Sequence, residues 1–148
     1  MIYTYAYPRP SVTVDIIVYK KINNETQILL IERGNEPFKN MWALPGGFID
    51  VDTDVELKDA AYRELKEETS INDINLEQFR TYGKIGRDPR GRTISIIFTG
   101  CFINHDQEVK AGDDAASLKW FKINELPDIA FDHKDIINDF LQKENSSK

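Results

Sequence analysis

A glycine turn followed by a helix with three spaced carboxylates constrains the fold of this chain more than any other feature. The turn is Gly46-Gly47, and the carboxylates belong to Glu64, Glu67 and Glu68. At about 100° per residue, Glu64 and Glu68 fall within the apolar arc of the helix, which consists of Leu57, Ala60, Ala61 and Leu65. The opposite side is expected to face solvent and carries Lys58, Asp59, Tyr62 and Lys66.

Two carboxylates on an apolar helix face need a physical reason. The simplest alternative is a solvated run of charge, as on most Glu-rich helices. However, glutamates at i and i+4 repel each other even when exposed, and an unpaired charge against an apolar surface costs much more. A divalent cation removes both objections, because hard cations prefer oxygen ligands and keep waters for substrate phosphates. The pattern therefore favours a Mg²⁺ site, with Mn²⁺ as the alternative metal.

The residues from Arg63 to Ile71 resemble the second half of the Nudix hydrolase signature, Gly-x₅-Glu-x₇-Arg-Glu-U-x-Glu-Glu-x-Gly-U, where U is a bulky aliphatic residue. Two departures are evident. The glutamate position falls on Val55 because two extra residues follow Gly47, so the replacement acid is Glu56 or one of Asp50, Asp52 and Asp54. Ser70 stands in place of the helix-ending glycine, where a left-handed backbone costs a non-glycine residue about 1 kcal/mol.

Strand and helix patterns alternate around the carboxylate helix. β-Branched and aromatic residues predict strands over residues 12–20, 27–33, 79–85, 93–103 and 117–123. Thr53, with Glu56 three residues on, indicates a capping box at the start of the helix. A final helix is predicted over residues 132–143, followed by a frayed tail from 144. This order fits the α/β fold that the Nudix resemblance implies, an α/β/α sandwich with a mixed β-sheet.

Length and composition favour one domain over residues 1–148. A chain of 148 residues buries about two-thirds of its unfolded surface in one core. No apolar run approaches the roughly 20 residues of a membrane span, and no signal pattern begins the chain, so we expect a cytoplasmic protein without a membrane partner. The formal net charge of −6 disfavours nucleic-acid binding. Cys101 is expected in a buried strand, and a homodimer is left open.

The chemistry of diphosphate hydrolysis suggests roles for the residues around the helix. The reaction requires neutralised phosphate oxygens and a water aligned with phosphorus, and bound metal supplies both. We therefore assign Glu64 and Glu68 as primary metal ligands, and Glu67 as a further ligand or as the base for the water. By resemblance, the carbonyl of Gly46 adds an oxygen ligand. Arg63 would orient the glutamates, with a surface ion pair as the alternative.

Residues outside the helix complete the predicted site. Asp113 and Asp114 lie in a loop where members of the family often place another acid, so either is an alternative base. Arg87, Asp88 and Arg90 belong to the only dense group of cations, which predicts contact with an anionic substrate or, alternatively, a charged hairpin turn.

Aromatic and histidine side chains give a further candidate surface. Phe131 is expected either in an adenine pocket or in the core, and His133 either in that pocket or in the first turn of the final helix.

Short blocks outside the signature narrow the substrate by resemblance. Residues 7–15, 88–93, 111–115 and 130–133 are similar to ADP-ribose pyrophosphatases, especially the Nudix half of bifunctional nicotinamide mononucleotide adenylyltransferases, and to the Nudix domains of NAD-related regulators. This implies hydrolysis of ADP-ribose, or a close nucleoside diphosphate derivative, to AMP and ribose 5-phosphate in NAD metabolism. The alternatives are a hydrolase of nucleoside triphosphates or dinucleotides, and a sensor that binds ADP-ribose without cleavage. The intact glutamates argue against the sensor, as does the expectation that no appended segment is long enough for a DNA-binding domain.

Overall fold

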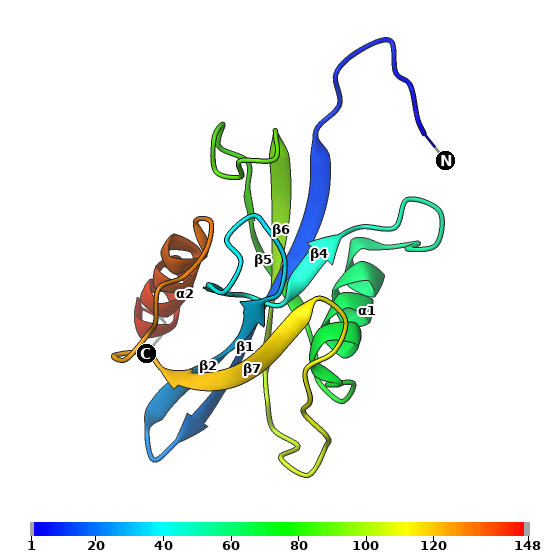
Figure 1. Cartoon of the computed structure of the whole chain (residues 1–148). Helices are drawn as coiled ribbons and strands as arrows, with labels where there is room; N and C mark the ends of the chain where they lie inside the picture. The colour runs from blue at the N-terminus through cyan, green and yellow to red at the C-terminus, as the bar shows by residue number, and fades with distance from the viewer. Residues whose placement is uncertain (1, 147–148) are drawn as a thin grey trace.

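A seven-stranded mixed β-sheet forms the centre of the protein, in a computed structural model that describes residues 2–146 (Figure 1). Its strands are β1 (Ser11–Ile22), β2 (Glu25–Arg33), β3 (Trp42–Ala43), β4 (Gly46–Phe48), β5 (Glu77–Tyr82), β6 (Thr93–Cys101) and β7 (Ala115–Lys122). The helices are α1 (Leu57–Thr69) and α2 (His133–Ser146). The strand order is β3-β2-β1-β6-β5, with β4 paired to β1 and β7 paired to β2.

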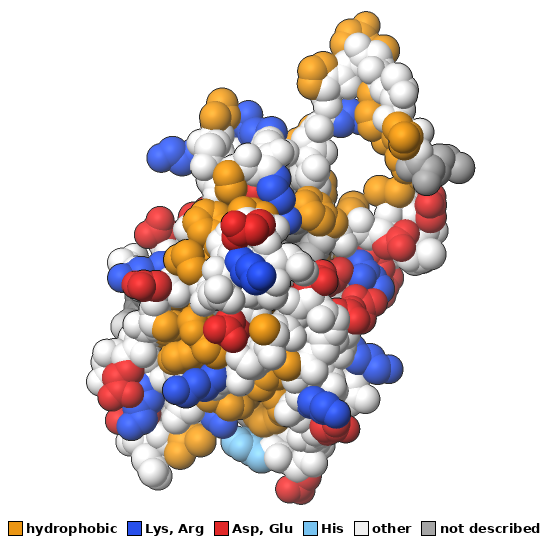
Figure 2. All heavy atoms as spheres, in the orientation of Figure 1, with side chains coloured by type: hydrophobic (Ala, Val, Ile, Leu, Met, Phe, Trp, Pro, Cys, Tyr) orange, Lys and Arg blue, Asp and Glu red, His pale blue; other side chains and the backbone are white. Residues whose placement is uncertain are grey.

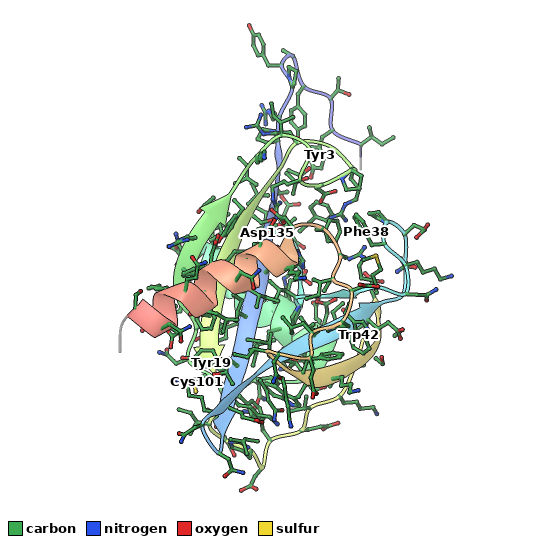
Figure 3. All side chains as sticks on the ribbon, turned by 90° about the vertical axis from the view of Figure 1, so that its left-hand side faces the viewer. Tyr3, Tyr19, Phe38, Trp42, Cys101 and Asp135 are labelled. Atoms are coloured by element: carbon green, nitrogen blue, oxygen red, sulfur yellow. The ribbon has the colours of Figure 1, made fainter. Side chains whose placement is uncertain are left out.

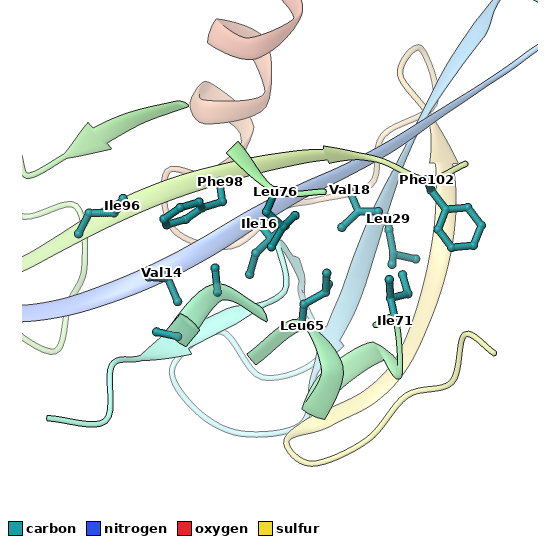
Figure 4. Packing of buried hydrophobic residues seen from close by; sticks show 12 residues of the cluster. Val14, Ile16, Val18, Leu29, Leu65, Ile71, Leu76, Ile96, Phe98 and Phe102 are labelled. Carbon is teal, nitrogen blue, oxygen red and sulfur yellow. The ribbon is translucent and has the colours of Figure 1, made fainter. Parts of the chain in front are cut away.

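The two helices cover opposite faces of the sheet because side chains alternate along its central strands. On β1, Ile16 packs in the cluster that contains Leu65 of α1 (Figure 4). Its neighbour Ile17 packs in the cluster that contains Ile137 of α2. All four side chains are fully buried, and burial of each stabilises the fold by about 1.5–3 kcal/mol. The predicted α/β/α sandwich with a mixed sheet is confirmed.

Strand β1 changes partners along its length, and this change brings the glycine turn to the centre of the molecule. Residues 19–22 pair with β2, whereas residues 13–15 pair with β4. Along its other edge β1 runs parallel to β6 from Ser11 opposite Thr93 to Tyr19 opposite Cys101. Gly46 therefore lies opposite Asp15 in the sheet, shortly before the chain enters α1.

The start of α1 differs from the prediction. The helix begins at Leu57 with Glu56 as its N-cap, so the expected capping box of Thr53 with Glu56 is wrong. Thr53 instead lies in a loop in which its N–H donates to Asp50 at 3.1 Å, and Asp59 accepts from the N–H of Glu56 at 3.0 Å. Local side-chain bonds of this kind compete with the helix and delay its start.

The two faces of α1 follow the prediction except at two residues. Ala60, Ala61 and Leu65 are buried as expected, but Leu57 is 37% exposed. Tyr62, expected in solvent, packs against the core, and its hydroxyl accepts from the N–H of Leu76 at 3.0 Å. The aromatic ring extends the apolar arc because its length lets it reach the sheet from the edge of the helix.

The ends of the other elements lie within a few residues of their predicted positions. Ser70 ends α1 with a left-handed φ of 67°, as the glycine position of the signature requires. Helix α2 continues to Ser146, three residues beyond the predicted end, and residues 147–148 of the expected frayed tail lie outside the described residues. Cys101 ends β6 beside Tyr19 (Figure 3) and is only partly buried. Among residues 2–146, neither helix is long and apolar enough to span a membrane.

Candidate active site

A cleft of about 370 Å³ opens beside α1 and β4. Its lining includes every residue of the predicted site except Arg63, namely Gly46, Glu64, Glu67, Glu68, Arg87, Asp88, Arg90, Asp113, Asp114 and Phe131. Arg63 lies directly behind the lining through its contacts to Glu64 and Glu67. On the face drawn in Figure 2, acidic and basic side chains gather around the start of α1. The fold thus brings together residues that are up to 85 positions apart in the chain.

The carboxylates of α1 differ strongly in exposure. Glu68 is 6% exposed, and one of its oxygens accepts from the N–H of Gly46 at 2.7 Å. The Glu64 side chain is 13% exposed, whereas that of Glu67 is 41% exposed at the rim. Burial raises the pKa of Glu68 to about 8 and also raises the pKa of Glu64. The prediction that the helix turns two acids inward is therefore correct for Glu64 and Glu68.

Gly47 makes room for one of these acids. A Cβ at position 47 would lie 2.6 Å from a carboxylate oxygen of Glu64, well inside van der Waals contact. Gly46 is restricted even more, because a Cβ there would overlap the backbone carbonyl oxygen of Val14 and lie 2.5 Å from a carboxylate oxygen of Asp15. The glycine turn is thus required by the close approach of the backbone of β1 and of acidic side chains from α1 and β1.

Arg63 links the carboxylates to the loop before the helix. Its guanidinium binds both oxygens of Asp54, at 2.8 and 3.0 Å. A third nitrogen donates to Glu64 at 2.8 Å and to Glu67 at 3.2 Å. Hydrogen bonds to Asp54 are the largest cause of the raised pKa of Arg63. Of the four acids considered for the missing signature glutamate, Asp54 is the one that contacts Arg63.

The loop before β7 brings two further acids to the cleft. Asp113 and Asp114 both line the cleft, and the N–H of Gly112 donates to the backbone carbonyl of Glu68 at 3.1 Å. This bond anchors the loop to the end of α1. Asp114 accepts from the side chain of Asn35 at 3.2 Å, so Asp113 is the less engaged of the two acids.

The arginine-rich loop places its two predicted arginines in different environments. Arg87 is 4% exposed, and its guanidinium binds both oxygens of Asp132 at 2.7 and 2.9 Å. Arg90 is 36% exposed and binds Asp88 while its guanidinium lies 4.7 Å from the ring centre of Phe48. Arg87 is therefore largely committed within the protein, whereas Arg90 presents a face to the cleft.

An aromatic and cationic surface forms another wall. The ring of Phe131 is packed edge-on against Phe38 at 4.8 Å, and the guanidiniums of Arg33 and Arg90 lie 4.9 and 5.3 Å from its centre. Planar guanidiniums and aromatic rings are surfaces on which a nucleobase stacks. Sequence reasoning missed Arg33, because nothing marks it among the charged residues at the end of β2.

Asp15 is a second residue that sequence reasoning did not assign. It lies in the middle of the apolar strand β1, is 7% exposed and lines the cleft. Burial raises its pKa to about 7, while Arg87, Ser95 and Thr13 oppose this shift. An acid within an otherwise apolar strand is a signal that could have identified it, because burying a carboxylate without a function is costly.

The buried carboxylates of Glu64, Glu68 and Asp15, here called the acidic wall, have the oxygen donors that suit a hard divalent cation. Burial is the largest cause of the raised pKa values of Glu64, Glu68 and Asp15, and the arginines nearby offset it only in part. A divalent cation would supply the missing positive charge, and carboxylate oxygens are ligands that Mg²⁺ and Mn²⁺ accept. Among residues 2–146, no three His, Cys, Asp or Glu side chains already form a metal-binding group. Backbone oxygen, water or substrate phosphate would therefore have to complete the coordination, as is usual for Mg²⁺.

The fold and this cleft together define a class of protein, an α/β/α domain with an acidic helix beside a glycine turn. The NUDIX domain model matches residues 11–140. The chain therefore belongs to the NUDIX family.

Three proteins that are similar to this chain have known names or ligands. An ADP-ribose pyrophosphatase from Methanocaldococcus jannaschii is 44% identical over 139 residues, which cover 94% of this chain and 78% of that protein. The ADPR responsive transcriptional repressor NtrR from Acinetobacter baylyi is 35% identical over 144 residues, covering 95% of this chain and 56% of that protein. The NUDIX domain of Shewanella oneidensis NrtR, solved with ADP ribose, superimposes with a TM-score of 0.84 at 30% identity and covers 93% of this chain and 90% of that one.

These matches confirm two predictions, namely the Nudix resemblance and the enzyme class of Nudix pyrophosphohydrolase. The roles assigned to individual site residues stay predictions.

Proposed function

We propose that the protein hydrolyses the diphosphate linkage of ADP-ribose, with Mg²⁺ as cofactor, to give AMP and ribose 5-phosphate. The observation that carries the proposal is the buried pair of Glu64 and Glu68, held beside Gly46 at the wall of a cleft with an aromatic and cationic side. The 44% identity to an ADP-ribose pyrophosphatase supports the choice of substrate. Mn²⁺ is the alternative metal.

Each part of the cleft would have a separate task. Glu64, Glu68 and the carbonyl of Gly46 would hold the cation, which when bound neutralises the diphosphate and lowers the pKa of a bound water. Arg63 keeps Glu64 and Glu67 in position through its bonds to both. A carboxylate oxygen of Glu67, Asp113 or Asp114 would take the proton from the attacking water. Phe131 and Arg90 would bind the base and the diphosphate.

A sensor is the second candidate function, because a transcriptional repressor is among the relatives. In that case the same cleft would bind ADP-ribose without cleavage. The intact set of Glu64, Glu67 and Glu68 favours the enzyme, since binding alone does not need carboxylates placed for metal and proton transfer. Hydrolysis of triphosphates or dinucleotides would use the same acidic wall with different contacts to the sugar.

Four further statements stay predictions: a cytoplasmic location, a homodimer, the absence of nucleic-acid partners and a role in NAD metabolism.

The proposal is tested with the purified chain, a panel of nucleoside diphosphate derivatives and triphosphates, and either Mg²⁺ or Mn²⁺. AMP and ribose 5-phosphate are expected from ADP-ribose, EDTA should abolish the reaction, and ¹⁸O from water should enter one of the two phosphates. Cleavage of triphosphates with ADP-ribose left intact would support the second type of hydrolase. Tight binding of ADP-ribose without product under either metal would support the sensor.

A further inference from the structure

A polar notch at the floor of the cleft is not used by the proposed metal chemistry. It lies between Nε2 of His133 and Oδ1 of Asp15, which are 3.9 Å apart. His133 is 4% exposed and Asp15 is 7% exposed, yet both line the cleft. A separation of 3.9 Å is too long for a direct hydrogen bond, but it suits a third oxygen that bonds to both atoms.

The two sides of the notch have opposite hydrogen-bonding character. The N–H of Leu44 donates to Nδ1 of His133 at 3.0 Å, so the neutral ring carries its hydrogen on Nε2. Burial lowers the pKa of His133 to about 3, which keeps the ring neutral. Asp15 accepts from the hydroxyl of Thr13 through its other oxygen at 3.4 Å. The notch therefore presents one donor and one acceptor, and a hydroxyl group satisfies both.

The position of the notch matches the order of groups in a nucleotide. On one side, the ring of His133 lies 5.2 Å from that of Phe131 in the aromatic wall. On the other side, Asp15 is paired in the sheet with Gly46, whose N–H donates to Glu68. The sequence of aromatic wall, notch and carboxylates corresponds to base, ribose and diphosphate.

We propose that Asp15 and His133 bind a ribose hydroxyl of the substrate. This inference rests on the proposed function, because it requires a nucleoside diphosphate that carries ribose. The order of the walls favours the ribose of the adenosine, although the terminal ribose of ADP-ribose has the same chemistry. The two residues would select ribose-containing substrates, since a site built to bind a hydroxyl discriminates against analogues that lack it.

Binding measurements in a double-mutant cycle test the inference. The wild type, Asp15→Ala and the control Asp106→Ala are titrated by calorimetry with ADP-ribose and with analogues that lack one hydroxyl on either ribose. Ca²⁺ replaces Mg²⁺, and product analysis excludes turnover. Asp106 is an exposed acid that does not line the cleft, so its substitution matches the change of charge. For the wild type, removal of the bound hydroxyl should weaken binding about tenfold, and Asp15→Ala should abolish this difference while the control retains it.

The outcomes show whether Asp15 and His133 bind a ribose hydroxyl, and whether that hydroxyl belongs to the adenosine or to the terminal ribose. A penalty for an adenosine analogue alone assigns the notch to the nucleoside, and a penalty for a terminal-ribose analogue alone assigns it to the other sugar. Equal affinity of the wild type for all analogues, or a penalty that Asp15→Ala leaves unchanged, overturns the inference and leaves the notch to an ordered water. Absence of ADP-ribose binding by the wild type overturns it as well. If Asp15→Ala does not fold, His133→Phe, which keeps a ring but removes the Nε2–H donor, takes its place in the cycle with the same expected result. Binding is the readout, so a lack of hydrolysis would refute the proposed function without deciding the notch.

Discussion

At the scale of single residues, Asp54 supplies the acid that contacts Arg63, while the signature position of that acid falls on Val55. Its carboxylate holds Arg63 with two bonds, and Arg63 in turn holds Glu64 and Glu67. We expect Asp54→Asn to lower kcat about tenfold or more, because a charged bidentate pair becomes a weaker neutral contact. Asp52→Asn, in the same exposed loop, is the matched control and should leave kcat unchanged. Equal kcat values for both variants, with circular dichroism showing intact folds, would remove Asp54 from the site.

The two arginines of the cleft should separate binding from stability. Arg90→Ala is expected to raise KM for ADP-ribose at least tenfold with little change in stability, since Arg90 is partly exposed at the cleft. Arg87→Ala should lower the free energy of unfolding by about 2 kcal/mol or more, because it leaves Asp132 and Ser95 without their buried partner. Steady-state kinetics and urea unfolding of both variants measure these effects. Unchanged kinetics in both would make the loop a charged turn only.

At the scale of elements, the glycine turn and α1 act as one unit. Gly47→Ala in β4 would drive a methyl group into the carboxylate of Glu64, so we expect turnover to fall at least tenfold. The control is Gly83→Ala, where the added methyl group would meet Ile94 at an ordinary 3.6 Å. Both variants are compared by turnover and by thermal unfolding. Wild-type turnover in Gly47→Ala would show that Glu64 does not need its observed position.

The helical period of α1 predicted its inward acids, but it did not predict how the rest of the site is assembled. The start of the helix was misplaced because Asp50 and Asp54 bond within the preceding loop. Asp15 could not be assigned to the site, since its approach to Gly46 depends on a strand register that is set by the whole sheet. Local patterns therefore identified α1, whereas long-range pairing determined which strand residues face it.

At the scale of the whole molecule, the buried Glu68 should make stability depend on pH when metal is absent. A pKa raised to about 8 means that the folded state binds this proton more tightly than the unfolded chain does. The contribution of Glu68 to the free energy of unfolding is therefore fully present below about pH 4.5 and is lost as the pH rises toward 8. Asp15, with its pKa raised to about 7, also loses its contribution to the free energy of unfolding as the pH rises, but at lower pH than Glu68. His133 has its pKa lowered to about 3, so its contribution is lost as the pH falls, and only below about pH 6.5.

Between pH 7 and 8 Glu68 contributes most of the change in unfolding free energy, because Asp15 is already about half deprotonated at pH 7. In EDTA, the wild type should lose about 1 kcal/mol of unfolding free energy across this window, and Glu68→Gln should lose much less. Added Mg²⁺ should restore the unfolding free energy of the wild type, because it binds the folded state. It should change the unfolding free energy of the variant little. Urea unfolding at the two pH values measures both effects. A loss of the same size in the variant would assign the pH dependence to another group.

Helix α1 turns Glu68 inward, where we propose that it holds the catalytic cation, and Glu68→Gln removes only the charge that this role requires. The amide keeps the shape of the side chain but removes the charge, so Mg²⁺-dependent hydrolysis of ADP-ribose should fall at least 100-fold while circular dichroism stays that of the wild type. Glu125→Gln, an exposed residue outside the cleft, should retain full activity. Activity of Glu68→Gln within a few-fold of the wild type would show that Glu68 does not hold the cation.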